Sequence, residues 1–469
     1  MLSYFPKYFT TKSINIYIGA LILCNIIFFS HSLPIIWWLF GITEVIGFFY
    51  YANKLTKEWI NLSQINFQKK LFISALFIRI IWVILSYFFY TIVNGNPFEY
   101  SSADAISYHA EADWLTGMII KGNLEPYFSY INGRYSDLGY TFYLGWQYWI
   151  TGSSIIIARL IKALLGAYMC VLVYKLAKRN FGESVGRMSA IFCMLMPNLI
   201  YYAGLHTKEV EMVFISVAFV ERMDFLFRSR NYSPINIILP ILFAGSLFFF
   251  RTVLGVTTIF AFFSTVVFLP AKLLGIGKRS LLLVWVLVTI SYFVGGRIAA
   301  EVENTWATKT SNQEASLSFR STRVNGNTLA KYASSVVFVP LIFVIPFPTI
   351  INTPNQENLQ LINGGNYVKN ILAFFVIYAL FWVIINKKWR EFVLIGSFSI
   401  GYLLIIANSS FAQSERFHQP ALPFLLIIAS FGINKITNNE KKYFDLYLGV
   451  IFIAILGWSW YKLAGRGLA

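Results

Sequence analysis

The stretch Ser101–Gly117, SSADAISYHAEADWLTG, gathers the side chains of this chain that are best suited to proton chemistry. Its titratable groups are Asp104, His109, Glu111 and Asp113. At helical spacing Asp104, Tyr108 and Glu111 share one face, whereas His109 and Asp113 lie four residues apart on a neighbouring face. A carboxylate in this setting can take a proton from an attacking hydroxyl group. We therefore interpret the stretch as an active-site loop beside a membrane surface, with Asp104 as its reactive group.

Each of these groups also has an alternative interpretation. Asp104 could be the N-cap of a helix that begins at Ala105, and Glu111 and Asp113 could be charges on a helix surface. His109 could pair with Asp113 or contact substrate. His109 and the nearby carboxylates could also hold a divalent metal ion, but their spacing is not diagnostic. We therefore expect neither a metal nor another cofactor.

A membrane-surface carboxylate surrounded by cationic side chains suits a lipid-phosphate substrate. The phosphate of such a sugar donor is already a good leaving group, and cationic donors must absorb the charge that develops as it departs. Arginine can meet a phosphate with two parallel hydrogen bonds. Direct attack from the face opposite the phosphate would invert the anomeric configuration of the sugar. The substrate-binding candidates are Tyr108, His109, Glu111, Arg134, Lys208, Glu209, Arg251, Arg320, Arg416 and His418.

Most of these candidates could instead have a structural role. Glu209 could belong to a helix start, and Arg251 could be an intramembrane arginine that extends its charge to the membrane surface. Arg416 and His418 could be interfacial anchors. Charges in long loops could contact solvent or lipid headgroups, and these are Arg134, Arg320 and Arg323.

The composition of the chain is that of a membrane scaffold. Of its 469 residues 57% are hydrophobic and only 13% are charged, whereas about a quarter of the residues of a soluble domain are charged. Many apolar runs approach the ~20 residues that a helix needs to cross a bilayer. These runs are continuous, unlike the alternating segments of a membrane β-barrel. We therefore predict an all-α polytopic membrane protein.

The charge pattern predicts how the chain crosses the membrane. The formal charge is +17, from 38 basic and 21 acidic residues. Many basic residues lie in short loops between apolar runs, as in loops retained in the cytoplasm. We therefore predict a multi-pass protein of the cytoplasmic (inner) membrane and no nucleic-acid partner. The basic loops are Lys54–Lys70, Lys175–Arg187, Arg228–Arg230, Lys272–Arg279 and Lys387–Arg390.

Placing these loops inside gives about thirteen transmembrane helices. The 37 residues of Pro234–Pro270 would form a helix of roughly 55 Å, longer than the ~30 Å hydrocarbon core. We therefore expect a hairpin there, with Arg251 near its external turn. Val336–Ile350 contains three prolines and is expected to be re-entrant or interfacial. The other spans are Ile14–Ser30, Leu33–Tyr51, Leu71–Val93, Ser153–Leu176, Met188–Leu205, Val210–Phe227, Leu281–Gly296, Tyr367–Asn386, Phe392–Ala407, Pro420–Ile433 and Phe444–Tyr461.

This topology predicts five parts and one external site, facing the periplasm or the cell exterior. Every polar cluster lands on the external face, and these clusters are Asp104–Asp113, Arg134, His206–Glu209, Arg251, Arg320–Arg323 and Arg416–His418. The parts are N-terminal transmembrane helices (1–93), an external catalytic loop with interfacial helices (94–150), a transmembrane core (151–296), an external loop with the re-entrant segment (297–366) and C-terminal transmembrane helices (367–469).

Several motifs resemble those of a known family. Ala103-Asp-Ala-Ile-Ser-Tyr108 resembles the first-loop motif of the GT-C superfamily of membrane glycosyltransferases, and Leu138-Gly-Tyr-Thr-Phe-Tyr-Leu-Gly145 is similar to its Gly-Tyr-Pro interfacial helix. Thr141 stands where proline is usual. Further segments resemble the branch of the protein O-mannosyltransferases and the lipid A aminoarabinose transferases, or the family's Arg-Tyr…Pro-x-x-Pro segment. They are Ala158–Gly166, Tyr174–Gly182, Pro197 with His206–Glu209, and Glu415–Pro423.

The resemblance is continuous over Asp104–Phe214 and thin afterwards. It implies a GT-C-like fold, Asp104 as the catalytic base and a polyprenyl-phosphate sugar as the donor. The acceptor would be a glycan, a lipid or a protein on the external face. Ala103 and Ala105 flank Asp104 where the mannosyltransferases carry an acidic pair. We also see no soluble C-terminal domain that would bind the acceptor.

Two other functions fit parts of the pattern. A polysaccharide or O-antigen polymerase or ligase would use a glycan linked to lipid pyrophosphate and would place arginines such as Arg320 and Arg323 in a large late loop. A transporter of lipid-linked sugars would show paired discontinuous helices and internal repeats. Only Val336–Ile350 reads as broken, and no repeat is visible, so the sequence favours the glycosyltransferase.

Overall fold

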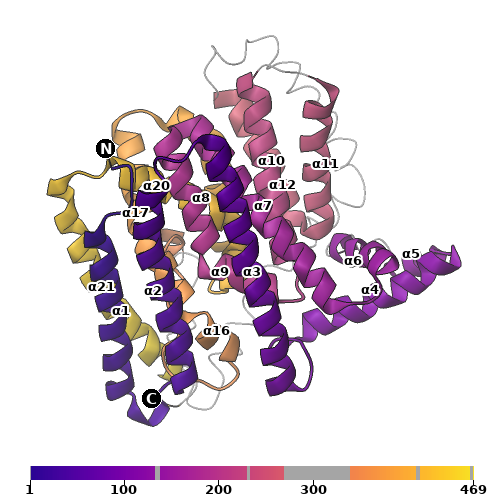
Figure 1. Ribbon diagram of the computed structural model, residues 1–469, viewed down its shortest axis with the longest axis horizontal. Helices are drawn as coiled ribbons and strands as arrows, with labels where there is room; N and C mark the ends of the chain where they lie inside the picture. Colours follow the sequence, from indigo (N-terminus) through magenta and orange to yellow (C-terminus); the bar gives the residue numbers. More distant parts are fainter. Residues whose placement is uncertain are drawn as a thin grey trace.

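The computed structural model describes residues 2–131, 138–229, 233–268, 339–407, 412–464 and 468, and every regular element in these ranges is a helix (Figure 1). Seven helical segments are long and apolar enough to cross a membrane, judged by length and composition. They are Lys7–Ile27 (α1), Ile35–Glu58 (α2), Gln64–Asn94 (α3), Ile155–Phe181 (α7), Asn363–Ile385 (α17), Glu415–Lys435 (α19 and α20) and Asn438–Ala464 (ending in α21). Three shorter apolar helices are Pro234–Phe250 (α11), Thr252–Phe268 (α12) and Val393–Ala407 (α18).

These helices confirm the predicted all-α character for the described residues, and their length and apolar composition are consistent with a membrane-embedded protein. The count of thirteen spans and the GT-C-like fold stay predictions. The remaining helices are Ala103–Lys121 (α4), Glu125–Ile131 (α5), Leu138–Thr151 (α6), Glu183–Leu195 (α8), Pro197–Tyr201 (α9), Glu209–Ser229 (α10) and Glu357–Leu361 (α16). Within the last two membrane-length segments, the separate helices are Glu415–His418 (α19), Leu422–Lys435 (α20) and Lys441–Ala464 (α21).

Ion pairs and hydrogen bonds of arginine side chains gather at one end of the bundle, which we call the basic end. Arg179, near the end of α7, pairs with Glu221 and with Asp224 (2.8 Å) of α10. Arg228, one turn further along α10, pairs with Asp224 at 2.8 Å. Arg187 of α8 donates to backbone carbonyl groups of the α2–α3 loop. Residues of three loops predicted to be cytoplasmic therefore meet at the basic end.

The opposite end of the bundle, which we call the site end, carries the beginnings of α4 and α10. The 21 residues of α10 separate the two ends by about 30 Å at 1.5 Å per residue. Figure 1 shows that the N-terminus and the C-terminus lie at opposite ends of the bundle. The α16 segment lies at the same end as the C-terminus.

Arg251 separates α11 from α12, as the length of the apolar run predicted. Its backbone is extended, with φ −167° and ψ 113°, so the helix stops at Phe250 and restarts at Thr252. A Cβ added at Gly255 would overlap the ring of Phe248. Residues on either side of Arg251 therefore face each other, and the predicted hairpin is confirmed.

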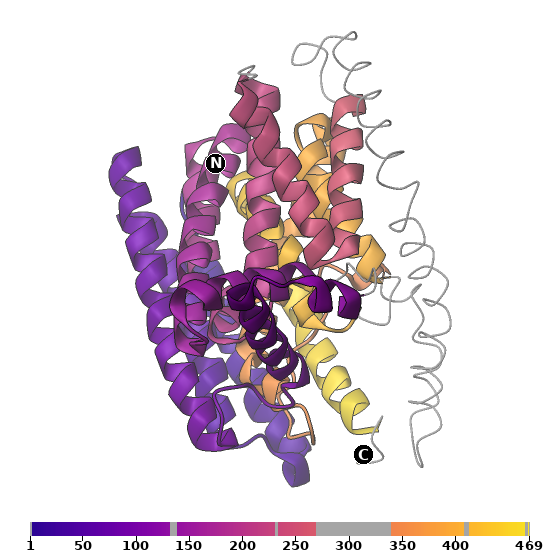
Figure 2. The ribbon, with the colours of Figure 1, turned by 90° about the vertical axis from the view of Figure 1, so that its right-hand side faces the viewer.

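The first large loop forms three helices, α4, α5 and α6, which lie to one side of the bundle (Figures 1 and 2). Gly122 ends α4 with φ +66°, a left-handed conformation that glycine adopts without strain. Thr116 of α4 donates to the Gly145 carbonyl of α6 at 3.0 Å, which fastens the two helices together. Several large side chains stay exposed, as in interfacial helices: Ile120, Phe128, Tyr130, Trp146 and Trp149.

Two predicted segments are broken by proline. The run Met188–Leu205 was expected as one span, but α8 ends at Leu195 and Pro197 begins α9, because proline cannot continue a helix that precedes it. Of Val336–Ile350, residues 339–350 are described, and they form one short turn followed by irregular backbone.

The irregular backbone before α16 is held by two side chains of α17. Lys369 donates to the Ile345 carbonyl, and Asn370 donates to the carbonyls of Val344 and Pro346. Non-helical backbone at membrane depth must find its hydrogen bonds within the protein. These contacts therefore fit the expected re-entrant segment, and the described part forms no spanning helix.

Candidate functional site

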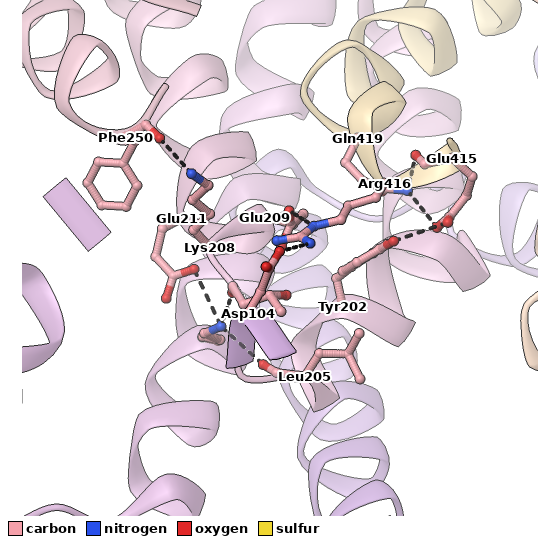
Figure 3. A network of polar contacts seen from close by, with 12 residues as sticks. Asp104, Tyr202, Leu205, Lys208, Glu209, Glu211, Phe250, Glu415, Arg416 and Gln419 are labelled. Atoms are coloured by element: carbon pink, nitrogen blue, oxygen red, sulfur yellow. Dashed lines mark hydrogen bonds and ion pairs between the residues drawn. The ribbon is translucent and has the colours of Figure 1, made fainter. Parts of the chain in front are cut away.

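Arg416 links two carboxylates from distant parts of the chain (Figure 3). Its Nη1 lies 2.5 Å from Oδ2 of Asp104, in the first turn of α4. Its Nε donates to Oε1 of Glu209, the first residue of α10. The Asp104 side chain is 57% exposed and the Glu209 side chain is 0% exposed. One guanidinium therefore connects an accessible carboxylate to a buried one.

Glu209 is held in its charged form by its neighbours. Burial opposes ionisation, but the guanidinium groups of Arg416 and Arg251 lower the pKa of Glu209 to about 2. A buried carboxylate that keeps its charge needs a permanent cationic partner. Glu209 therefore anchors Arg416, while Asp104 is the partner that solvent or substrate can reach.

Lys208 adds a second cation beside this pair. Its Nζ donates to the Phe250 carbonyl at 3.1 Å, which ties α10 to the end of α11 (Figure 3). The same ammonium lies 5.8 Å from the ring centre of Tyr108. Burial and then the charge of Arg251 lower the pKa of Lys208 to about 7. The charge of Lys208 can therefore change near neutral pH.

Arg251 provides a third cation, at the turn of the α11–α12 hairpin. Its guanidinium lies 4.3 Å from the ring centre of Phe417, a cation–π contact with the residue after Arg416. Its Nη1 is buried and has no hydrogen-bond partner among the described residues. Arg251 therefore has one N–H donor without a partner in this part of the structure, and it lies close to Arg416 and Lys208.

A cavity of about 210 Å³ opens beside the Asp104–Arg416 pair. Both of these side chains line it, and so does Tyr202, whose hydroxyl donates to Glu415 at 3.1 Å. Ser101 also lines the cavity. Its backbone φ of +52° is a strained conformation for a residue other than glycine. The other lining residues are Glu99, Tyr100, Ser102, Ala103, Tyr201, Leu205, Thr207 and Asn358.

A second polar network fixes the turn that carries Lys208 and Glu209. The Tyr148 hydroxyl lies 2.8 Å from Nδ1 of His109 and 2.9 Å from Nε2 of His206. Burial lowers the pKa of both imidazoles. His109 and His206 are therefore neutral hydrogen-bonding groups near pH 7.

Lys162 of α7 forms hydrogen bonds to the backbone of the same turn. Its Nζ donates to the carbonyls of Leu205 (3.0 Å) and Thr207 and lies 3.7 Å from Glu211. The Lys162 side chain is fully buried. Movement of the turn would therefore expose this charge or separate it from the carbonyl groups that accept its hydrogen bonds.

The structure brings together six of the eleven predicted site residues. Three of the six, Asp104, Glu209 and Arg416, are more than a hundred residues apart from one another in the sequence. These six are Asp104, Tyr108, Lys208, Glu209, Arg251 and Arg416. Three others contact different partners: His109 meets Tyr148, Glu111 accepts from Tyr127 at 3.4 Å, and His418 lies 2.7 Å from Lys369. Arg134 and Arg320, as well as Arg323, lie outside the described residues.

Sequence reasoning missed several residues of the site. Glu99, Tyr202 and Glu415 line the cavity but were not among the candidates. Arg159 and Lys162 are buried charges in α7, and the argument that singled out Arg251 as a charge in an apolar run applies equally to them. Glu415 is the direct neighbour of Arg416, but nothing in the sequence around Glu99 marks it.

Comparison with models of protein families, with curated proteins and with solved structures finds no match. Within the described residues, no group of three or more His, Cys, Asp or Glu side chains could hold a metal ion. The site itself and the motifs of the sequence are therefore what indicates the function of this protein.

Removal of Arg416 should destabilise the fold far more than neutralisation of Asp104. Arg416→Gln leaves Glu209 buried without its partner, which costs about 3–5 kcal/mol, whereas Asp104→Asn removes an exposed contact worth less than about 1 kcal/mol. Unfolding of the purified protein in detergent measures both. The double variant Arg416→Gln/Glu209→Gln should recover part of the loss. Equal losses for the two single variants would show that Glu209 does not depend on Arg416.

Proposed function

We propose that this protein is an inverting glycosyltransferase that moves one sugar from a polyprenyl-phosphate donor to a hydroxyl group of a glycan, lipid or protein acceptor. The observation that carries the proposal is the cavity that Asp104 and Arg416 share. Lys208 contacts the end of α11, and Arg251 lies against Phe417, the residue after Arg416. An exposed carboxylate can act as a general base. Arg416 in the same cavity can receive a departing phosphate, and the charges of Lys208 and Arg251, which do not line the cavity, add to the positive potential there.

The transfer step needs only groups that this site supplies. Asp104 takes the proton of the acceptor hydroxyl as its oxygen forms a bond to the anomeric carbon. The bond from that carbon to the phosphate oxygen breaks, and its electron pair leaves with the polyprenyl phosphate. Arg416 and Lys208 stabilise the charge on the leaving group. Attack and departure on opposite faces of the ring invert the anomeric centre.

The pairing of Asp104 with Arg416 describes the site before substrate enters. A phosphate that binds Arg416 competes with Asp104 for Nη1, while the Nε contact with Glu209 is retained. Loss of the ion pair frees the Asp104 carboxylate to accept a proton. Donor binding and activation of the base are therefore coupled through one guanidinium.

The positions of the charged loops support an external active site. Basic loops stay in the cytoplasm, and Arg179, Arg187 and Arg228 gather at the basic end. The site end would then face the periplasm or the cell exterior of the cytoplasmic membrane. Polyprenyl chains of the donor would lie in the bilayer, with the phosphate at its surface.

Asp104→Asn should abolish transfer and leave the protein folded. Loss of a general base lowers kcat by about 100- to 10,000-fold. Release of polyprenyl phosphate from a labelled donor in proteoliposomes measures the rate. Asp113→Asn is the matched control, since Asp113 lies on the same helix and accepts a hydrogen bond from Ser153. Near-normal turnover by Asp104→Asn would refute the assignment of the base.

Binding of polyprenyl phosphate should depend on pH through Lys208. The pKa of Lys208 is lowered to about 7, and the ammonium form, present below that pH, is the one that attracts phosphate. Affinity should therefore fall as pH rises above about 7, by up to tenfold per pH unit. Lys208→Arg stays charged and should remove this fall.

Titration of the protein in nanodiscs with polyprenyl phosphate between about pH 6 and pH 9 tests this dependence. The phosphate itself gains charge with a pKa of about 6, but this change is common to both proteins. Lys121→Arg, at the exposed end of α4, should keep the wild-type profile. An unchanged profile in Lys208→Arg would exclude Lys208 as a phosphate ligand.

A further inference from the structure

The cavity beside Asp104 has one wall that the phosphate chemistry does not use. Glu99 and Asn358 line this wall. Glu99 is only 8% exposed, and its Oε2 is buried with no hydrogen-bond partner among the described residues. Asn358 donates to the Tyr100 carbonyl at 2.7 Å, and its Oδ1 is buried without a partner in the same part of the structure.

Two unmatched buried acceptors are unfavourable unless something completes them. A carboxylate oxygen and an amide oxygen both accept hydrogen bonds. A group that completes them must be a donor, and a hydroxyl group of a bound molecule can supply it once the two side chains turn these buried atoms toward the cavity. We call the surface formed by Glu99 and Asn358 the acceptor wall.

The charges around the cavity restrict what this molecule can be. Three carboxyl groups line the cavity, those of Glu99, Asp104 and Glu415, against one cationic lining residue, Arg416. The Arg416 guanidinium is already shared between Asp104 and Glu209. A neutral ring with several hydroxyl groups fits these surroundings, whereas an additional carboxylate on the ring would meet the charge of Asp104. It would also lie beside the carboxyl groups of Glu99 and Glu415. Burial raises the pKa of Glu99, and a second negative charge would disfavour its ionised form further.

The size of the cavity restricts the molecule further. Its volume of about 210 Å³ is below the ~300–1,000 Å³ of pockets for drug-sized ligands. It corresponds to roughly seven water molecules at ~30 Å³ each. One sugar ring fits this space better than an oligosaccharide. Tyr201 and Tyr202 line the same cavity.

We propose that the acceptor wall is a sugar subsite that binds one neutral, polyhydroxylated ring, and that Glu99 discriminates against uronic acids. In identifying this ring as the transferred sugar, the inference rests on the proposed function. The binding preference itself requires no transfer. Glu99 is then a substrate-binding residue that determines specificity, five residues before the proposed base.

Binding of three defined ligands to the full-length protein in nanodiscs tests this subsite. The ligands are a short prenyl phosphate, the same phosphate carrying glucose or mannose, and the same phosphate carrying glucuronate. The neutral-sugar ligand should bind about tenfold more tightly than the bare phosphate or the uronate, the effect of one or two hydrogen bonds. Equal affinity for neutral sugar and uronate in the wild-type protein would overturn the proposal.

Variants of Glu99 assign the preference to this residue. Glu99→Gln keeps the shape and removes the charge, so the ratio between neutral sugar and uronate should shrink to within about threefold. Glu99→Ala should lose most of the advantage of the neutral sugar over the bare phosphate. Unchanged affinity for the bare phosphate shows that each variant is folded.

Two comparisons make the outcome specific. Glu125→Gln, at an exposed position of α5, is the matched control and should keep the wild-type ratio. A wild-type ratio in Glu99→Gln would remove Glu99 from the subsite. Full transfer activity in Asp104→Asn would overturn the proposed function while leaving these binding ratios in force, so the two failures are distinguishable.

Discussion

The contact between Arg416 and the buried carboxylate of Glu209 is the interaction on which the site depends. An ionised carboxylate with no exposed surface in an apolar bundle needs a close cationic partner, and Arg416 supplies it from a segment 207 residues away. This pair fixes the start of α10 against α19. It also leaves Nη1 of Arg416 directed at Asp104, which is the exposed and therefore exchangeable partner.

The surrounding helices keep this arrangement in place. Lys162 and the Tyr148–His206 contact hold the turn before α10, and the break at Arg251 brings the end of α11 within reach of Lys208. The cationic side chains therefore stand at helix ends and turns. A backbone carbonyl group contacts Lys208 there, and an aromatic ring contacts Arg251. A phosphate entering the site would find donors that are positioned in advance, so little ordering is needed on binding.

The sequence predicted the parts of this arrangement that follow from length and charge. Apolar run length predicted the helical bundle and the hairpin at Arg251, and the alternation of loops placed Asp104, Glu209 and Arg416 at one end. It could not show which acid Arg416 would meet, because the partners are far apart in the chain. Glu99 lies in irregular backbone without periodicity, and Pro197 divides a run that hydropathy alone reads as continuous. Glu111 and His418 share segments with site residues, but their side chains contact Tyr127 and Lys369 instead.

The most direct test of this account is an experimental structure of the protein with polyprenyl phosphate bound. We predict that the phosphate lies within hydrogen-bonding distance of Arg416 Nη1 and close to Lys208. In that complex Arg416 should keep its contact with Glu209, and the Asp104 carboxylate should be released into the cavity. A phosphate bound at the basic end, or an Asp104–Arg416 pair left intact beside a bound phosphate, would contradict the account.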